Sequence, residues 1–189
     1  MKTRGKIFIA VLVLAATIFI WTSLPNNVYE DVYSGEFDEP ITQGNNEEIS
    51  WRDITLKDTL TSQEYKISDY DGQVIILETF AVWCPTCRKQ QQEIKKLIDS
   101  GDNSIHISLD IDPNEDEEKV KGHAEKNGFE WFFSVSPVSL TKELIEEFGP
   151  TVANAPQAPT IIICPDGNVQ LLENGEKDSG ELAQHIASC

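Results

Sequence analysis

Two cysteines separated by two residues stand where thiol chemistry is favoured. Cys84 and Cys87 lie in the sequence WCPTCR, after an apolar segment and at the start of an expected helix. A helix N-terminus stabilises a thiolate through unpaired N–H groups and the macrodipole, so we expect Cys84 to be an exposed nucleophile with a lowered pKa. Cys87, one turn later on the same helix face, would attack the mixed disulfide and release the substrate. The pattern predicts dithiol–disulfide exchange through a redox-active Cys84–Cys87 disulfide.

The residues around these cysteines are candidates for substrate contact. Trp83 would cover the site and offer an apolar docking surface, and Pro85 and Thr86 lie between the two thiols. Arg88 has two interpretations: a positive charge near the thiolate, or a surface residue of the helix. We therefore predict substrate binding around Trp83, Pro85 and Thr86.

Other interpretations of a CxxC pair fit less well. Half of a zinc site needs a second pair of ligands, but Cys164 and Cys189 are isolated and the three histidines show no ligand spacing. A merely structural disulfide is out of place at a strand-to-helix junction. A copper-binding module would use the thiols as soft ligands and add a histidine or methionine, whereas Met1 is the only methionine. A peroxidase would need a peroxidatic cysteine with its own threonine and arginine neighbours, and WCPTCR is more similar to the site of a disulfide reductase. We expect no metal and no organic cofactor.

The two remaining cysteines leave alternatives open. Cys164 follows an apolar run and is expected to end a core strand as a small hydrophobic residue. Cys189 would then be a free thiol. A Cys164–Cys189 disulfide is the alternative in an oxidising compartment, and the sequence gives no distance between the two residues.

The elements that must position the cysteines alternate between strands and helices. Residues 74–80 form a nearly continuous apolar run, typical of a strand buried on both faces, and Pro85 suits the first turn of a helix over 85–100. The alternation, closed by a hairpin, predicts an α/β sandwich with a mixed sheet. The other expected strands are residues 51–56, 64–67, 103–109, 131–135, 159–164 and 169–172, and the other expected helices are 114–126, 139–148 and 178–187.

At this point the chain resembles a known family. The sequence DGQVIILETFAVWCPTCR at residues 71–88 is similar to the membrane-anchored thioredoxin-like proteins of the TlpA/ResA type, within the thioredoxin superfamily. The APT at residues 158–160 and the PDG at 165–167 match a second landmark of that family, and the resemblance covers about residues 50–188. It implies a thioredoxin-like three-layer sandwich with a central mixed β-sheet. It also implies exchange of protein thiols outside the cytoplasm, with electrons often taken from a membrane transporter.

The resemblance also assigns roles to single residues. Pro159 would be a cis-proline opposite the cysteines, with Ala158 pairing with substrate through its backbone. Glu78, six residues before Cys84, would be a buried acid that moves protons for the resolving cysteine, with a raised pKa; the alternative is an outward-facing residue on a sheet edge. Gln90 stands where ResA-type proteins carry a glutamate, so proton handling would fall to Glu78 alone.

The N-terminal residues predict a membrane anchor. Residues 7–24 are uncharged and apolar, close to the ~20 residues that cross a bilayer. Basic residues within 1–6 and acidic residues further on predict a cytoplasmic N-terminus and an extracytoplasmic C-terminal domain in a single-pass protein of the cell membrane. A cleaved signal peptide is the main alternative, although no small-x-small cleavage site follows. We expect a cytoplasmic stub at 1–6, an anchor at 7–24 that contacts the lipid bilayer, an acidic linker at 25–48 and a thioredoxin-like domain at 49–189.

The acidic net charge of the chain limits the classes of partner that it can bind. The chain has 32 acidic and 15 basic residues and a formal net charge of -17, which argues against nucleic acid and against docking on anionic lipid through a basic patch. The expected partners are protein thiol or disulfide substrates and either a membrane electron donor or a soluble thiol reductant. Because no histidine between the cysteines favours the thiolate strongly, we expect a reductase.

Overall fold

A five-stranded mixed sheet runs through residues 50–189, the part of the chain that this computed structural model describes. The strand order is β5-β4-β3-β6-β7; β3, β4 and β5 are parallel, and β6 and β7 run antiparallel to their neighbours. β3 is central and precedes the two cysteines. The strands are β3 (Ile75–Phe80), β4 (Ile105–Asp110), β5 (Phe132–Val135), β6 (Thr160–Ile163) and β7 (Val169–Leu171).

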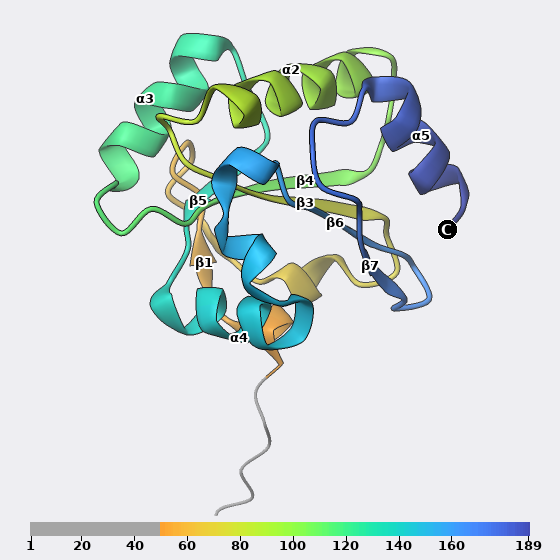
Figure 1. Ribbon diagram of the computed structural model, residues 1–189, viewed down its shortest axis with the longest axis horizontal. Coiled ribbons are helices and arrows are strands. Elements are labelled where there is room, and N and C mark those ends of the chain that lie inside the picture. Colours follow the sequence, from red (N-terminus) through yellow and green to blue (C-terminus); the bar gives the residue numbers. More distant parts are fainter. Residues whose placement is uncertain (1–49) are drawn as a thin grey trace, which may run out of the picture. The chain divides into compact units, whose positions relative to one another are not determined.

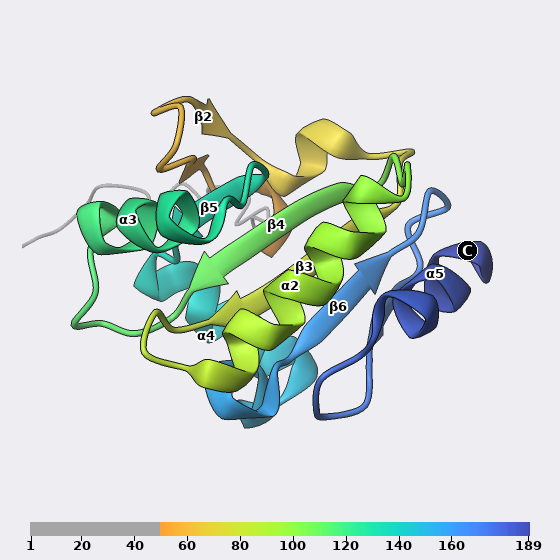
Figure 2. The ribbon, with the colours of Figure 1, turned by 90° about the horizontal axis from the view of Figure 1, so that it is seen from above.

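Helices cover both faces of the sheet. Figure 1 shows α2 (Pro85–Asp99), α3 (Glu117–Asn127) and α5 (Ser179–Ala187) on one face and α4 (Val138–Phe148) on the other. Seen from above, α2 lies across β3 and its neighbours (Figure 2). The predicted three-layer α/β sandwich with a central mixed sheet is confirmed.

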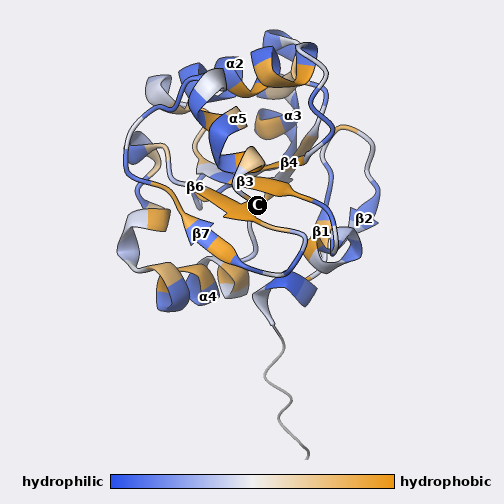
Figure 3. Cartoon of the chain, turned by 90° about the vertical axis from the view of Figure 1, so that its right-hand side faces the viewer, coloured by the Kyte–Doolittle hydropathy of each residue, from blue (hydrophilic) through white to orange (hydrophobic). Residues whose placement is uncertain are grey.

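The core forms because β3 is apolar on both faces. All six of its residues are buried, and successive side chains point to opposite faces. Ile75 and Leu77 pack in the cluster that includes residues of α4, whereas Ile76 packs with residues of α2 and α5. Figure 3 shows this apolar sheet between helices whose outer surfaces are polar. Glu78, two residues after Ile76, therefore faces α2.

The predicted strand over residues 51–56 is mostly wrong. Trp51–Asp53 is a short 3-10 helix, and the hairpin keeps only β1 (Leu56–Lys57) and β2 (Glu64–Tyr65). Trp51 is buried edge-on against Phe148, with ring centroids 5.9 Å apart. Tertiary packing of one large side chain thus replaces the extended conformation that the alternating pattern predicts.

Side chains fix where the helices begin. α2 starts at Pro85, as predicted, with Cys84 as its N-cap. α3 starts three residues later than predicted because the Asp116 carboxylate accepts from the backbone N–H of Lys119. Two further 3-10 turns, Pro150–Ala153 and Ala155–Gln157, were not predicted and lead into β6.

The predictions for residues 1–6, 7–24 and 25–48 lie outside the described residues. Within residues 50–189, no helix combines the length and apolarity that a membrane span requires.

Candidate active site

The two predicted cysteines meet at the N-terminus of α2. They form a disulfide with Cα atoms 5.4 Å apart. β3 ends at Phe80, the chain turns through residues 81–83, and Cys84 becomes the N-cap of the helix. Its Sγ accepts a hydrogen bond from the backbone N–H of Cys87 at 3.1 Å. A negative sulfur at this position would be stabilised by that N–H group and by the helix dipole.

Cys84 is not the exposed residue that we predicted. In the disulfide it is 1% exposed, and Cys87 is fully buried. Both pack in an apolar cluster with Phe80, Val120 and Phe133, because α3 and β5 cover the disulfide on one side. Cys87 Sγ also lies 3.1 Å from the backbone carbonyl oxygen of Ala155. Cys84 also lines a cavity at the start of α2.

Trp83 is the exposed large apolar residue of the site. Its side chain is 60% exposed, and its indole N–H donates to Asp112 Oδ2 at 2.6 Å. The N–H of the preceding Val82 donates to Glu115 Oε2 at 2.7 Å. Two carboxylates from the segment after β4 thus fix the loop that carries Trp83. The indole of Trp83 thus has a defined orientation, and its role as an apolar docking surface stays a prediction.

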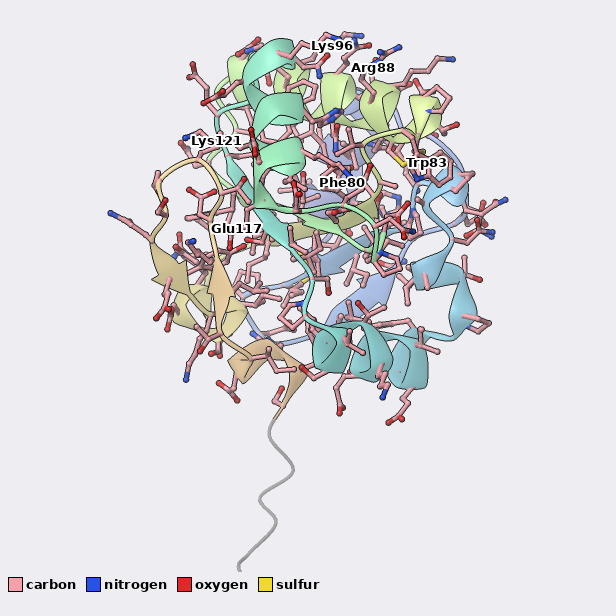
Figure 4. The ribbon with its side chains drawn as sticks, turned by 90° about the vertical axis from the view of Figure 1, so that its left-hand side faces the viewer. Phe80, Trp83, Arg88, Lys96, Glu117 and Lys121 are labelled. Carbon is pink, nitrogen blue, oxygen red and sulfur yellow. A yellow bond between two sulfur atoms is a disulfide. The ribbon has the colours of Figure 1, made fainter. Side chains whose placement is uncertain are left out.

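The other residues of the motif have different exposures. Pro85 and Arg88 are exposed, and Thr86 is half-buried. Figure 4 shows Trp83 and Arg88 at the same end of α2. Their contact with a substrate stays a prediction.

Glu78 lies in the centre of the sheet, beneath α2, and not on a sheet edge. It is 2% exposed and pairs in register with Ser108 of β4 and Thr160 of β6. The Ser108 hydroxyl donates to Glu78 Oε1 at 2.5 Å and accepts from the Trp131 indole N–H at 2.9 Å. Burial raises the pKa of Glu78 to about 7, although Ser108, Gln91 and Lys177 each oppose the shift. A carboxyl group with this pKa can exchange protons near neutral pH.

A buried lysine shares this region and was missed from the sequence. Lys177 is 6% exposed, and burial lowers its pKa to about 8 while the negative charge of Glu78 opposes that shift. Gln90 holds the Lys177 backbone in place: Oε1 accepts from its N–H at 2.7 Å and Nε2 donates to its carbonyl at 3.2 Å. The glutamine at the position of the family's glutamate therefore bonds to the segment before α5. Lys177 looks like a surface residue in sequence, because nothing local signals its burial.

The cis-proline prediction is wrong. The Ala158–Pro159 peptide bond is trans. The chain turns into β6 at Ala158 instead, whose backbone is left-handed with φ 46° and ψ 55°. The Ala158 N–H donates to Ala155 at 2.8 Å, and its carbonyl accepts from Lys177 Nζ at 2.9 Å. Both backbone groups have internal partners, so the predicted substrate contact of Ala158 and Pro159 stays a prediction that requires those bonds to open.

The remaining two cysteines are also joined. Cys164, after β6, and Cys189, after α5, form a disulfide with Cα atoms 5.2 Å apart. This corresponds to the alternative in which both thiols are oxidised. It attaches α5 to the sheet.

Candidate metal ligands do not gather in the described part of the chain. Within residues 50–189, no three histidine, cysteine or acidic side chains are grouped as metal ligands would be.

Comparison with known proteins agrees with this geometry. A family model described as Redoxin matches residues 46–186. The chain is 24% identical over 140 residues to the thiol-disulfide oxidoreductase ResA of Geobacillus thermodenitrificans, covering 72% of this chain and 74% of the relative. It is 37% identical over 54 residues to the thiol:disulfide interchange protein DsbE of Pasteurella multocida, covering 28% of this chain and 30% of the relative. The matches span from 30% to 74% of the lengths of the curated relatives.

Solved structures share the fold. A secreted disulfide oxidoreductase of Mycobacterium tuberculosis aligns with a TM-score of 0.56 at 13% identity, covering 74% of this chain and 98% of that one. The chain therefore belongs to the Redoxin family, and it is similar to thiol–disulfide oxidoreductases of the ResA and DsbE types.

Proposed function

We propose that this protein reduces disulfide bonds in other proteins outside the cytoplasm, tethered to the cell membrane by residues 7–24. The observation that carries the proposal is the Cys84–Cys87 disulfide at the N-terminus of α2, beside the exposed Trp83. The apolar, uncharged segment at 7–24 supports the anchor.

The first step uses the reduced protein. The Cys84 thiolate attacks one sulfur of the substrate disulfide, that S–S bond breaks, and the other substrate sulfur leaves as a thiolate. A mixed disulfide between Cys84 and the substrate results. The N–H of Cys87 and the dipole of α2 stabilise the attacking thiolate before the step.

The second step releases the substrate. The Cys87 thiol gives its proton to Glu78, directly or through water, and its thiolate attacks the Cys84 sulfur. The second substrate sulfur leaves as a thiolate, and Cys84 and Cys87 are left oxidised. Glu78 suits this role because it is buried under α2 and its pKa is raised to about 7 by burial. Two electrons from a membrane donor or a soluble thiol reductant then restore the dithiol.

The reduction potential of the Cys84–Cys87 pair tests the direction. We expect a value near the thioredoxin end of the scale, about -270 mV, whereas a value near -120 mV would identify an oxidant. Equilibration with glutathione or dithiothreitol buffers, read by alkylation and mass, gives the potential. Cys84→Ser is the control, because it removes the couple and leaves Cys164–Cys189 in place. A wild-type protein without a reversible Cys84–Cys87 couple would refute the proposed function.

A further inference from the structure

The residues that line a cavity beside the Cys84–Cys87 disulfide indicate which charge a substrate should carry. This cavity has a volume of about 480 Å³ and lies between the start of α2 and one side of α3. Cys84 lines it, so this is where an incoming sulfur can reach the otherwise buried nucleophile. We call it the cationic cavity; the lining residues used below are Trp83, Cys84, Arg88, Lys119, His123 and Lys126.

The charged residues that line the cationic cavity all have one sign, while the carboxylates of Asp112 and Glu115 lie just outside the lining, where they hold Trp83 and Val82. Arg88, Lys119 and Lys126 line the cavity, and among the described residues no carboxylate does. Neither Arg88 nor Lys126 takes part in an ion pair within residues 50–189. Lys119 donates from Nζ to the backbone carbonyl of Asn114 at 2.7 Å and makes no ion pair within residues 50–189, although its charge helps to lower the pKa of Asp112. Three cations that line one opening and make no ion pair within residues 50–189 are unexpected in a chain with a net charge of -17.

The neighbouring histidine reports the same positive potential. His123 is buried, and Nε2 is 2.7 Å from Gln91 Oε1. Burial lowers the pKa of His123, and the positive charges of Arg88 and Lys126 lower it further. Burial is the larger cause and the two cations that line the cavity add to it, so the imidazole is neutral near neutral pH.

Trp83 separates this cavity from one of opposite character. A second cavity of about 300 Å³ is lined by Trp83, Asp112, Ala155 and Pro156, and its single charged residue is an acid. A polypeptide that crosses Trp83 to reach Cys84 thus meets positive charge on the α3 side only. Attraction between opposite charges fixes which way such a segment lies and how fast it arrives.

We propose that the cationic cavity binds an aspartate or glutamate side chain that lies next to the exchanging cysteine of the substrate protein. The preferred substrates are accordingly proteins whose target disulfide is flanked by acidic residues. The inference rests on the proposed function and deepens it, because it names the class of substrate that the same site selects.

Two matched peptides test the inference. Each carries one disulfide, with glutamate on both sides of the cysteine in the first and glutamine in the second. The reduced full-length protein, in a nonionic detergent, is mixed with each peptide, and the rate is followed by tryptophan fluorescence. We expect the second-order rate constant for this single round of reduction to be about fivefold higher for the acidic peptide at low ionic strength. The ratio of the two constants should fall toward one as salt screens the charges.

Variants identify the cavity as the source of the preference. Arg88→Gln, Lys119→Gln and Lys126→Gln together are expected to bring the ratio close to one. The matched control is Lys95→Gln, Lys96→Gln and Lys121→Gln, which removes the same charge from the same two helices at residues that do not line the cavity. Figure 4 shows Lys121 on the opposite side of α3 from Trp83. The control variant should keep the wild-type ratio.

The outcomes separate the inference from the proposed function. Reduction of neither peptide would overturn both. Rapid reduction of both peptides at equal rates would leave the proposed function standing and overturn the inference. A preference that survives high salt, or that survives in the cavity variant, would also overturn it. The neutral peptide gives each variant its own reference, so a change in Cys84 reactivity does not affect the ratio.

Discussion

Replacing Glu78 with glutamine is expected to stabilise the protein at neutral pH and much less in mild acid. Burial raises the pKa of Glu78 to about 7, whereas the ordinary pKa of a glutamate side chain is 4.5. The folded protein therefore retains a proton that the unfolded chain releases as pH rises through that interval. Stability that depends on this proton is fully present below the ordinary pKa and is lost as pH rises toward 7. Glutamine has no such proton to lose.

The structure sets the magnitude. With those two pKa values, the free energy of unfolding of the wild-type protein falls by about 2 kcal/mol more than that of the variant between about pH 5 and pH 7.5. Glutamine preserves the size of the side chain, and its Oε1 can still accept from the Ser108 hydroxyl. The upper pH stays below the pKa of Lys177, about 8, so that lysine remains mostly charged.

Urea unfolding at the two pH values measures the effect. Tryptophan fluorescence of the oxidised proteins gives the free energy of unfolding of wild type and Glu78→Gln at each pH. Ser108→Ala is a useful companion, because it removes the donor to Glu78 and should raise the pKa of the carboxyl further. An equal stability difference at both pH values would refute the reasoning, since it would mean that Glu78 titrates as an ordinary carboxyl group.

Predictions for two other variants follow from the same structure. Cys164→Ser with Cys189→Ser opens a bond that spans 25 residues and is expected to lower the free energy of unfolding by about 3 kcal/mol, with the Cys84–Cys87 potential unchanged; a changed potential would show that the second disulfide acts on the site. Gln90→Glu would place a carboxylate against the Lys177 carbonyl and is expected to cost about 3 kcal/mol at neutral pH. Burial raises the pKa of a carboxyl group at this position, so the lost free energy of unfolding should return as the pH falls toward the ordinary carboxyl range. Urea midpoints of the Gln90→Glu variant that do not change with pH would contradict this prediction.

The local part of the site could be predicted from sequence. An apolar run such as residues 74–80 and a proline at the first helical position are short-range signals, and they correctly placed the disulfide at the start of α2. These features depend on neighbours within a few residues, so pattern alone identifies them. The burial of Glu78 was implied by the family resemblance, because the apolar run alone left an outward-facing residue as the alternative.

Features that depend on distant segments were beyond the sequence. Lys177 reaches the sheet beneath α2 from a segment 87 residues after Gln90, and no local period marks it as buried. Hydrogen bonds to Ala155 and Lys177 hold the turn at Ala158. The family resemblance had predicted a cis-proline at this point of the chain instead. The prediction that Cys84 is exposed was wrong for a similar reason. Residues of α3 and β5, which are distant in the sequence, cover the disulfide.

The anchoring of Val82 and Trp83 by Glu115 and Asp112 has a consequence for protein engineering. The six residues WCPTCR are not a portable module, because their tryptophan takes its orientation from a connection that begins beyond β4. Grafting the motif alone onto another scaffold would transfer the two sulfurs and leave the indole without its acceptor. A graft that keeps the orientation of the tryptophan has to include residues 111–116 together with the motif. The smallest part of this site that can be transferred is therefore two loops.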